Sequence, residues 1–214
     1  MTTFPGSPRL IKGALIGVDP ANPVAGVVVF QYNPEQLTRK VTVQAAGARP
    51  ALGEALRLKG PPQETITLTV SIDAADQLER GDPQTLTVGL HPTLASLEML
   101  LYPKAPLMIA NEVLARIGVI EVIPPEVPLT LFVWGATRVL PVRVNELSIT
   151  EEAFDPLLNP ILAKVTMTLT VLSYQDLGLP TVGGALSMAH HVAKEVMATI
   201  HGLGTAAPNV GVGR

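Results

Sequence analysis

The most constraining feature of this sequence is an alternation of apolar and hydroxyl-bearing residues in two distant segments. In Gln63–Asp73 and again in residues 164–174, apolar residues occupy every second position and threonines fill most positions between them. A period of two places alternate side chains on opposite faces of a strand. Each segment is therefore predicted to be a β-strand with one polar and one buried face. The predicted buried residues are Ile66, Leu68, Val70 and Ile72, then Val165, Met167, Leu169 and Val171.

Residues 27–43, VVVFQYNPEQLTRKVTV, suggest a β-hairpin corner. The flanking strands are predicted over residues 24–32 and 36–44, and their Val, Phe, Tyr and Thr content favours strand. Pro34 fixes its own φ and biases Asn33 toward an extended conformation, so helix should not continue through the join. The Asn33 side chain is expected to bond its own backbone two residues on.

Further strands are predicted over residues 10–18, 118–123, 129–135 and 138–149. In the last of these the alternation changes parity, and an extra residue near Asn145 would restore one buried face, which predicts a β-bulge. Trp134, the single tryptophan, precedes Gly135 and is expected to pack in the core. The fold class predicted is mainly β: seven or eight antiparallel strands forming a barrel or a two-sheet sandwich.

Two helices are predicted beside these strands. Pro92 and Pro103 bound a short flanking helix over residues 93–102, whose leucines would cover one end of the barrel or sheet. A C-terminal amphipathic helix is predicted over residues 184–201, with Gly202 as its cap. Docking on its own domain and on a neighbour are equally compatible with the apolar stripe. That stripe contains Leu186, Ala189, Ala193, Val196, Ile200 and Leu203.

The chain is thus divided into an N-terminal arm over residues 1–9, a β domain over residues 10–176 and a helical extension over residues 177–214. Charged residues make up only 15% of the chain, against roughly 25% in typical soluble domains. We infer that other chains cover much of its surface. The net charge of −3 and the scattered Lys and Arg argue against nucleic acid as a partner. No window approaches a membrane-spanning length, and the N-terminus lacks a signal-peptide pattern, so membrane insertion is not expected.

Catalytic, cofactor and metal motifs are not found. The chain has no cysteine, and the acidic residues between positions 73 and 82 do not match a calcium loop. His190, Lys194 and His201 share one face of the predicted C-terminal helix, but no third metal ligand lies nearby in the sequence. The motifs therefore single out no catalytic, cofactor-binding or metal-binding residue, and we expect none.

Four segments together resemble the tube-domain proteins of contractile injection systems, which are phage tail-like particles. They are FQYNPEQLTRKV at residues 30–41, TLASLEMLLYP at 93–103, PLTLFVWG at 128–135 and KVTMTLTVLSYQ at 164–175. The resemblance spans residues 10–175, and its most distinctive residues are Asn33, Pro34, Trp134 and Gly135. It implies the tail-tube fold and a structural subunit that assembles into six-fold rings.

Within that family, the chain is most similar to the baseplate adaptors that connect the spike, the tube initiator and the baseplate wedge. Such a subunit would assemble in the bacterial cytoplasm and enter a particle that can be released. Many members of that family carry a C-terminal LysM module. The residues after Gln175 in this chain show no LysM pattern. The expected interface residues are Asn33 and Pro34, Trp134 and Gly135, and Leu186, Ala189, Val196 and Ile200 on the helix.

Two other roles in the same particle remain open, the inner-tube protein and the tube initiator. A different class of function is a β-barrel module that binds a small apolar ligand, and an enzyme without a recognised motif is a third hypothesis.

Overall fold

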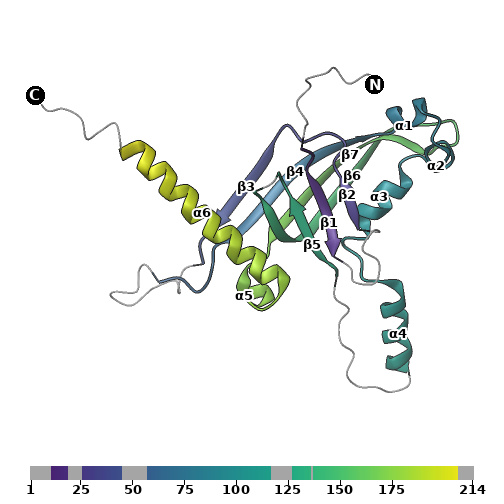
Figure 1. Cartoon of the computed structure of the whole chain (residues 1–214). Helices are drawn as coiled ribbons and strands as arrows, with labels where there is room; N and C mark the ends of the chain where they lie inside the picture. The colour runs from purple at the N-terminus through teal and green to yellow at the C-terminus, as the bar shows by residue number, and fades with distance from the viewer. Residues whose placement is uncertain (1–10, 19–25, 45–56, 117–126, 136, 207–214) are drawn as a thin grey trace, which may run out of the picture.

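A computed structural model describes residues 11–18, 26–44, 57–116, 127–135 and 137–206. The strands form one antiparallel sheet in the order β2-β1-β5-β6-β7-β4-β3 (Figure 1). Its members are β1 (Ala14–Val18), β2 (Val27–Val29), β3 (Leu37–Thr42), β4 (Gln63–Asp73), β5 (Leu129–Val133), β6 (Val139–Phe154) and β7 (Pro160–Val171). The predicted mainly β, antiparallel fold is confirmed. The predicted strand at residues 118–123 and the arm at residues 1–9 lie outside the described residues.

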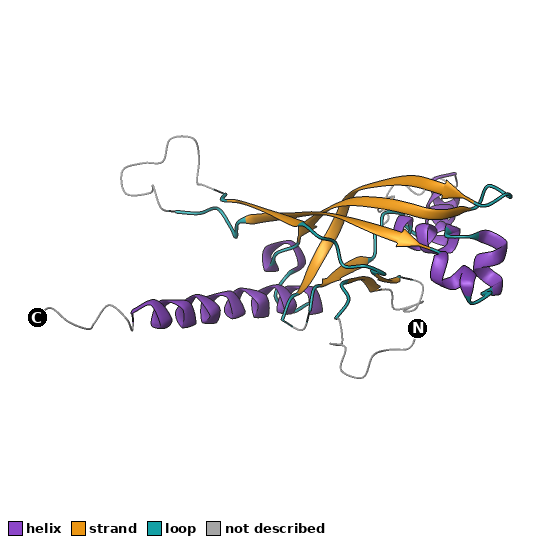
Figure 2. Cartoon of the chain, turned by 90° about the horizontal axis from the view of Figure 1, so that it is seen from above, coloured by secondary structure: helices purple, strands orange, loops and turns teal. Residues whose placement is uncertain are grey.

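The sheet is open rather than closed into a barrel or divided into a sandwich. In the described part of the chain, β2 and β3 each pair with a single strand and form the two edges. The sheet is strongly twisted and bent (Figure 2). The expected barrel or sandwich is thus corrected to a single curved sheet with two free edges.

The core lies on one face of this sheet. The apolar positions predicted for β4 and β7 are buried there: Ile66, Val165, Met167 and Leu169 have no measurable exposure. Partners of similar size meet across the strands, since Ile66 pairs with Leu169 and Leu68 with Met167. Val171, also predicted to be buried, is half-buried and packs against the edge of the core.

The predicted hairpin over residues 27–43 is wrong. β2 pairs with β1 and β3 with β4, so the two strands lie at opposite edges of the sheet. Pairing with β1 places Val28 and the adjoining Phe30 in the core, at 5% and 2% exposure. Burial of these side chains favours the observed partner over the neighbour in sequence. The segment that contains Asn33 and Pro34 therefore runs from the β2 edge of the sheet to the β3 edge.

The bulge expected near Asn145 is confirmed. The β6–β7 register shifts between Val144 and Glu146, and Asn145 donates a hydrogen bond from Nδ2 to Thr170 Oγ1. After the shift Leu147 and Ile149 again pack against the core, as the change of parity requires.

More helices are present than expected. They are α1 (Ala75–Glu79), α2 (Pro83–Val88), α3 (His91–Glu98), α4 (Ala105–Arg116), α5 (Tyr174–Leu177) and α6 (Val182–Ala206). The predicted flanking helix corresponds to α3, which buries Leu94 and Leu97. The polar stretch over residues 73–88 reads as a solvated loop in the sequence, but in the structure it contains α1 and α2. Asp82 caps α2 by accepting hydrogen bonds from Thr85 N and Thr85 Oγ1, and Pro83 suits its first turn.

The C-terminal helix is longer than predicted and Gly202 does not cap it, because α6 continues to Ala206. Gly183 and Gly184 at its start are buried. A Cβ on Gly184 would collide with the Gly178 carbonyl, so only glycine allows this approach. From there α6 runs out beyond the sheet (Figures 1 and 2).

Candidate functional site

A buried carboxylate joins the middle of α6 to the sheet. Glu64 on β4 is 5% exposed. Its Oε1 accepts a hydrogen bond from Arg39 Nε at 2.7 Å, and its Oε2 accepts one from Lys194 Nζ at 2.9 Å. Burial alone would raise the pKa of Glu64, but these hydrogen bonds and positive charges outweigh it and lower the pKa. Glu64 is therefore ionised at neutral pH and bonded through both oxygens.

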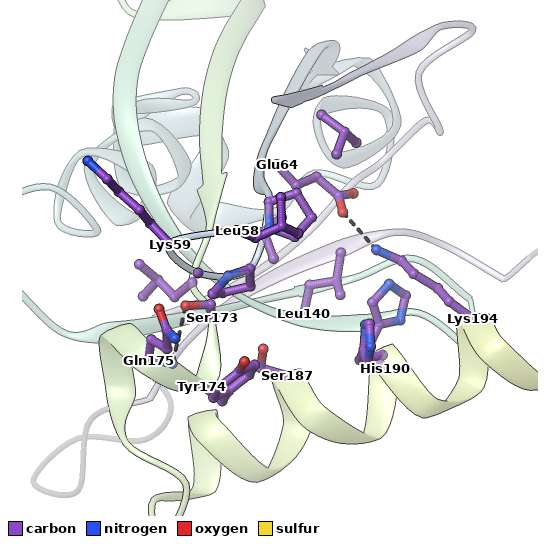
Figure 3. Close-up of a pocket in the computed structure, with 17 residues that line it drawn as sticks. Leu58, Lys59, Glu64, Leu140, Ser173, Tyr174, Gln175, Ser187, His190 and Lys194 are labelled. Atoms are coloured by element: carbon purple, nitrogen blue, oxygen red, sulfur yellow. Dashed lines mark hydrogen bonds and ion pairs between the residues drawn. The ribbon is translucent and has the colours of Figure 1, made fainter. Parts of the chain in front are cut away.

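A groove of about 430 Å³ lies beside this cluster, between α6, the 58–62 segment and the sheet (Figure 3). Leu140 forms part of its floor, and Ser187, His190 and Lys194 face it from α6. Both ring nitrogens of His190 are buried and have no hydrogen-bond partner within the described residues. Burial, and then the nearby Lys194 charge, lower the pKa of His190, so its imidazole is neutral at pH 7.

This arrangement holds a helix in place and does not resemble a reaction centre. Both oxygens of Glu64 bond to cations, and among the described residues no side chain forms a hydrogen bond with the neutral His190 ring. No group of three or more potential metal-ligating side chains occurs in the part of the chain that the structure describes. The groove is best explained as the junction where α6 docks on its own domain.

Two of the motifs singled out in the sequence meet at Gly13. Gly13 N donates a hydrogen bond to Asn33 Oδ1 at 2.9 Å, and Asn33 Nδ2 donates one to the Ile11 carbonyl at 2.9 Å. A Cβ at Gly13 would lie 2.9 Å from the Trp134 ring. Asn33 thus binds a distant strand end instead of forming the expected local turn. Because Gly13 has no side chain, the side chains of Asn33 and Trp134 can both approach its backbone.

The other residues of these motifs are Trp134, Gly135 and Pro34, and each has a defined place in the fold. Trp134 is half-buried and stacks on Phe132, with ring centroids 5.7 Å apart. Gly135 has a φ of +76° and ends β5 at the turn into β6. Pro34 is half-buried beside the open edge of the sheet.

The predicted stripe of α6 is divided between two environments. Leu186 is half-buried near the groove, whereas Ala189 is exposed. Val196 and Ile200 are 53% and 63% exposed. At 100° per residue, the face of His190 and Lys194 that docks on the sheet is well over 90° away from Val196. Docking α6 on its own domain therefore leaves most of the predicted stripe free.

Both edges of the sheet also present apolar side chains to solvent. On β2, Val27 and Val29 are 45% and 55% exposed, and at the opposite edge Val41 and Val43 are 54% and 59% exposed. Edge strands carry unpaired backbone donors and acceptors, and proteins usually protect them from further pairing with charges or prolines. β2 has neither.

Sequence reasoning missed the ion cluster and the exposed helix α4. A signal for the first was present, because Glu64 has the same parity as Ile66 and Leu68 and so falls on the buried face of β4. A carboxylate in that register requires a cation nearby. The sequence predicts an apolar connection over residues 104–128 with a short helical turn near residues 111–116, whereas the helix in the structure covers all of Ala105–Arg116.

None of the helices in the described part of the chain combines the length and apolar character that a bilayer crossing requires. No known family model matches the chain, and no curated protein is similar to it. One matching solved structure carries the description "Virion of native gene transfer agent (GTA) particle". It is 10% identical over 74% of this chain and 95% of that chain, with a TM-score of 0.27. A similarity of this size does not establish a shared fold.

Proposed function

We propose that this protein is a structural, non-catalytic subunit of a contractile injection particle and acts as its baseplate adaptor. The observation that carries the proposal is the open antiparallel sheet whose two edges expose apolar side chains. A sheet of this kind can be completed by neighbouring subunits, which pair with its edge strands. The resemblance of the four sequence segments to tube-domain proteins points to the same role.

The adaptor would assemble as a homo-oligomer, with a six-fold ring as the expected closed form. Its partners would be the spike, the tube initiator and the baseplate wedge subunits. Within this proposal the β domain forms the ring and the extension over residues 177–214 contacts other subunits. The low charge of the chain fits a surface that assembly covers.

The experiment is to purify particles from cells that produce this chain and to locate it by electron microscopy and mass spectrometry. We expect it between spike and tube, in rings. Recovery only in the body of the tube would favour the inner-tube alternative. A monomer that never joins a particle and retains a small apolar ligand would contradict the proposal and favour the binding module.

Edge variants sharpen this test. Replacing Val27 and Val29 by lysine places charges on β2, where they are exposed in the monomer, so the free energy of unfolding should change by less than about 1 kcal/mol. Incorporation into particles should fall strongly. The matched control is Leu86→Lys on α2, also exposed at 53% but away from either edge. Equal incorporation of both variants would argue against edge pairing.

A further inference from the structure

His190 on α6 has polar atoms that are buried without a partner. Its side chain extends from the helix into the groove, beside Leu140 and Lys194 (Figure 3). Both ring nitrogens are inaccessible to water, and neither forms a hydrogen bond within the part of the chain that the structure describes. A neutral imidazole carries one donor and one acceptor, and burial of such groups is unfavourable when they stay unpaired. The docked helix therefore holds this ring without compensation.

The charges around the ring oppose its protonation. Lys194 lies one turn further along α6, Arg39 comes from β3 and Arg138 precedes β6, and all three disfavour an imidazolium. Glu64 on β4 favours it. The two oxygens of this carboxylate, however, already accept hydrogen bonds from Arg39 and Lys194. A proton on His190 would thus add a positive charge to a cluster that already contains more cations than anions.

The other titratable groups beside the groove do not change this balance. Lys59 points away from α6, and Tyr174 on α5 contributes a phenol (Figure 3). His191 is 61% exposed and lies 3.2 Å from Glu195 on its own helix. Among the described residues that line the groove, Glu64 is the only carboxylate. The docked helix therefore offers a protonated His190 no free acceptor within this groove.

We propose that protonation of His190 releases α6 from the sheet, so that the docking of this helix depends on pH. Water does not reach the ring nitrogens while α6 is docked, so an imidazolium becomes hydrated only when this part of the helix moves away. The lowered pKa of His190 has the same origin, because it comes first from burial and then from the charge of Lys194. This inference concerns the folded chain alone and does not depend on the proposed role in a particle.

The direction of the pH effect follows from the lowered pKa. The ring binds a proton less readily in the docked chain than in the released one, where its pKa has the ordinary value of 6.5. Docking is therefore most favoured above pH 6.5. It weakens as the pH falls from there through the docked-state pKa, with a limit of about tenfold in the docking equilibrium per pH unit. The lowered pKa of Glu64 keeps that carboxylate ionised to below pH 4.5, so the two groups act in separate pH ranges.

Hydrogen exchange on the full chain measures this release. Protection of the α6 amides up to Lys194, corrected for the intrinsic effect of pH on exchange, should fall about threefold or more between about pH 7 and about pH 5. Amides of β7, which lies between β6 and β4 in the sheet, serve as the internal reference and should lose less protection. Constant protection of α6 over this range would show the proposal to be wrong.

A pair of variants assigns the effect to one ring. His190→Leu removes the titrating group and keeps an apolar side chain over Leu140, so protection of α6 should no longer depend on pH in this range. His191→Leu, which changes the exposed neighbour on the same helix, is the matched control and should retain the native pH dependence. The same pH dependence in His190→Leu as in the native chain, or its loss in His191→Leu, would overturn the inference.

The ring can also be titrated in the unmodified chain, which makes the test independent of how a variant folds. The NMR chemical shifts of the His190 ring should give a pKa below 6.5. Loss of protection in α6 should follow the same titration. A pKa for His190 at or above 6.5 would contradict the proposed coupling between protonation and release.

Discussion

At the residue scale, Glu64 shows how one carboxylate can connect three elements. It lies on the buried face of β4, and its two cations come from the edge strand β3 and from α6. A charge removed from water on folding must be compensated, and both of its oxygens have a charged partner. The cluster therefore fixes where α6 docks.

Glu64→Gln should destabilise the protein by about 3 kcal/mol, because it leaves two cations without their counter-charge. Chemical denaturation near neutral pH measures the loss. Glu79→Gln on the exposed surface of α1 is the matched control and should change the free energy of unfolding by less than about 0.5 kcal/mol.

The same substitution has a defined pH dependence. The pKa of Glu64 is lowered on folding, from an ordinary value of 4.5. The ionised form thus stabilises the native state above that value, and this contribution is lost as the pH falls through the folded-state pKa. The difference between the native protein and Glu64→Gln should be constant near neutrality and shrink below pH 4.5. A difference that grows on acidification would contradict the assignment.

At the element scale, α6 is divided along its length into a part that contacts the sheet and a part that does not. The part up to Lys194 contacts the sheet, and the residues after it project beyond the sheet. Small residues at the start, Gly183 and Gly184, allow close packing, while the distal stripe is large and apolar. The helix is thus held by its own domain, while its distal stripe stays exposed.

Two truncations separate these parts. A chain that ends at Ala198 keeps one turn after Lys194 and should retain its free energy of unfolding to within about 0.5 kcal/mol. It should nevertheless enter particles less well, because the extension proposed to contact other subunits then lacks the exposed Ile200 and Leu203. A chain that ends at Thr181 also loses the Lys194 ion pair and the cover over Leu140, and should be destabilised by about 3 kcal/mol or more. Equal stability of the two truncations would contradict the division.

The strands of this fold were largely predictable from the sequence, whereas their pairing partners and several of the helices were not. Period-two alternation identified β4 and β7, their buried faces and the bulge at Asn145, because side-chain direction is a local property. The hairpin at Asn33 was wrong because consecutive strands usually pair, and here burial of Phe30 favours β1. Likewise Arg39, Glu64 and Lys194 are brought together only by the tertiary fold.

At the scale of the whole molecule, low charge and exposed apolar edges predict that the proposed association is mainly hydrophobic. The chain carries 15% charged residues and a net charge of −3. The edges proposed for pairing expose Val27 and Val29 on β2, and Val41 and Val43 at the β3 edge. Interactions of this type depend little on electrostatic screening.

Self-association should therefore be unchanged or strengthened by added salt, and it should weaken on cooling. Sedimentation at low and high ionic strength, repeated at two temperatures, provides the measurement. Dissociation by moderate salt would mean that charged contacts dominate, and would direct attention to Arg39 and Lys40 at the exposed edge instead.

The order of strands also has a consequence for the synthesis of the chain. The N-terminal half supplies both borders of the sheet, as the pairs β1–β2 and β3–β4, whereas β5, β6 and β7 supply its centre. On the ribosome, therefore, the borders emerge first, and no ladder of paired strands connects them until β7 appears. Contacts this distant in sequence slow folding. The newly made chain must then keep its unpaired valine-rich borders apart from other chains until its centre is complete.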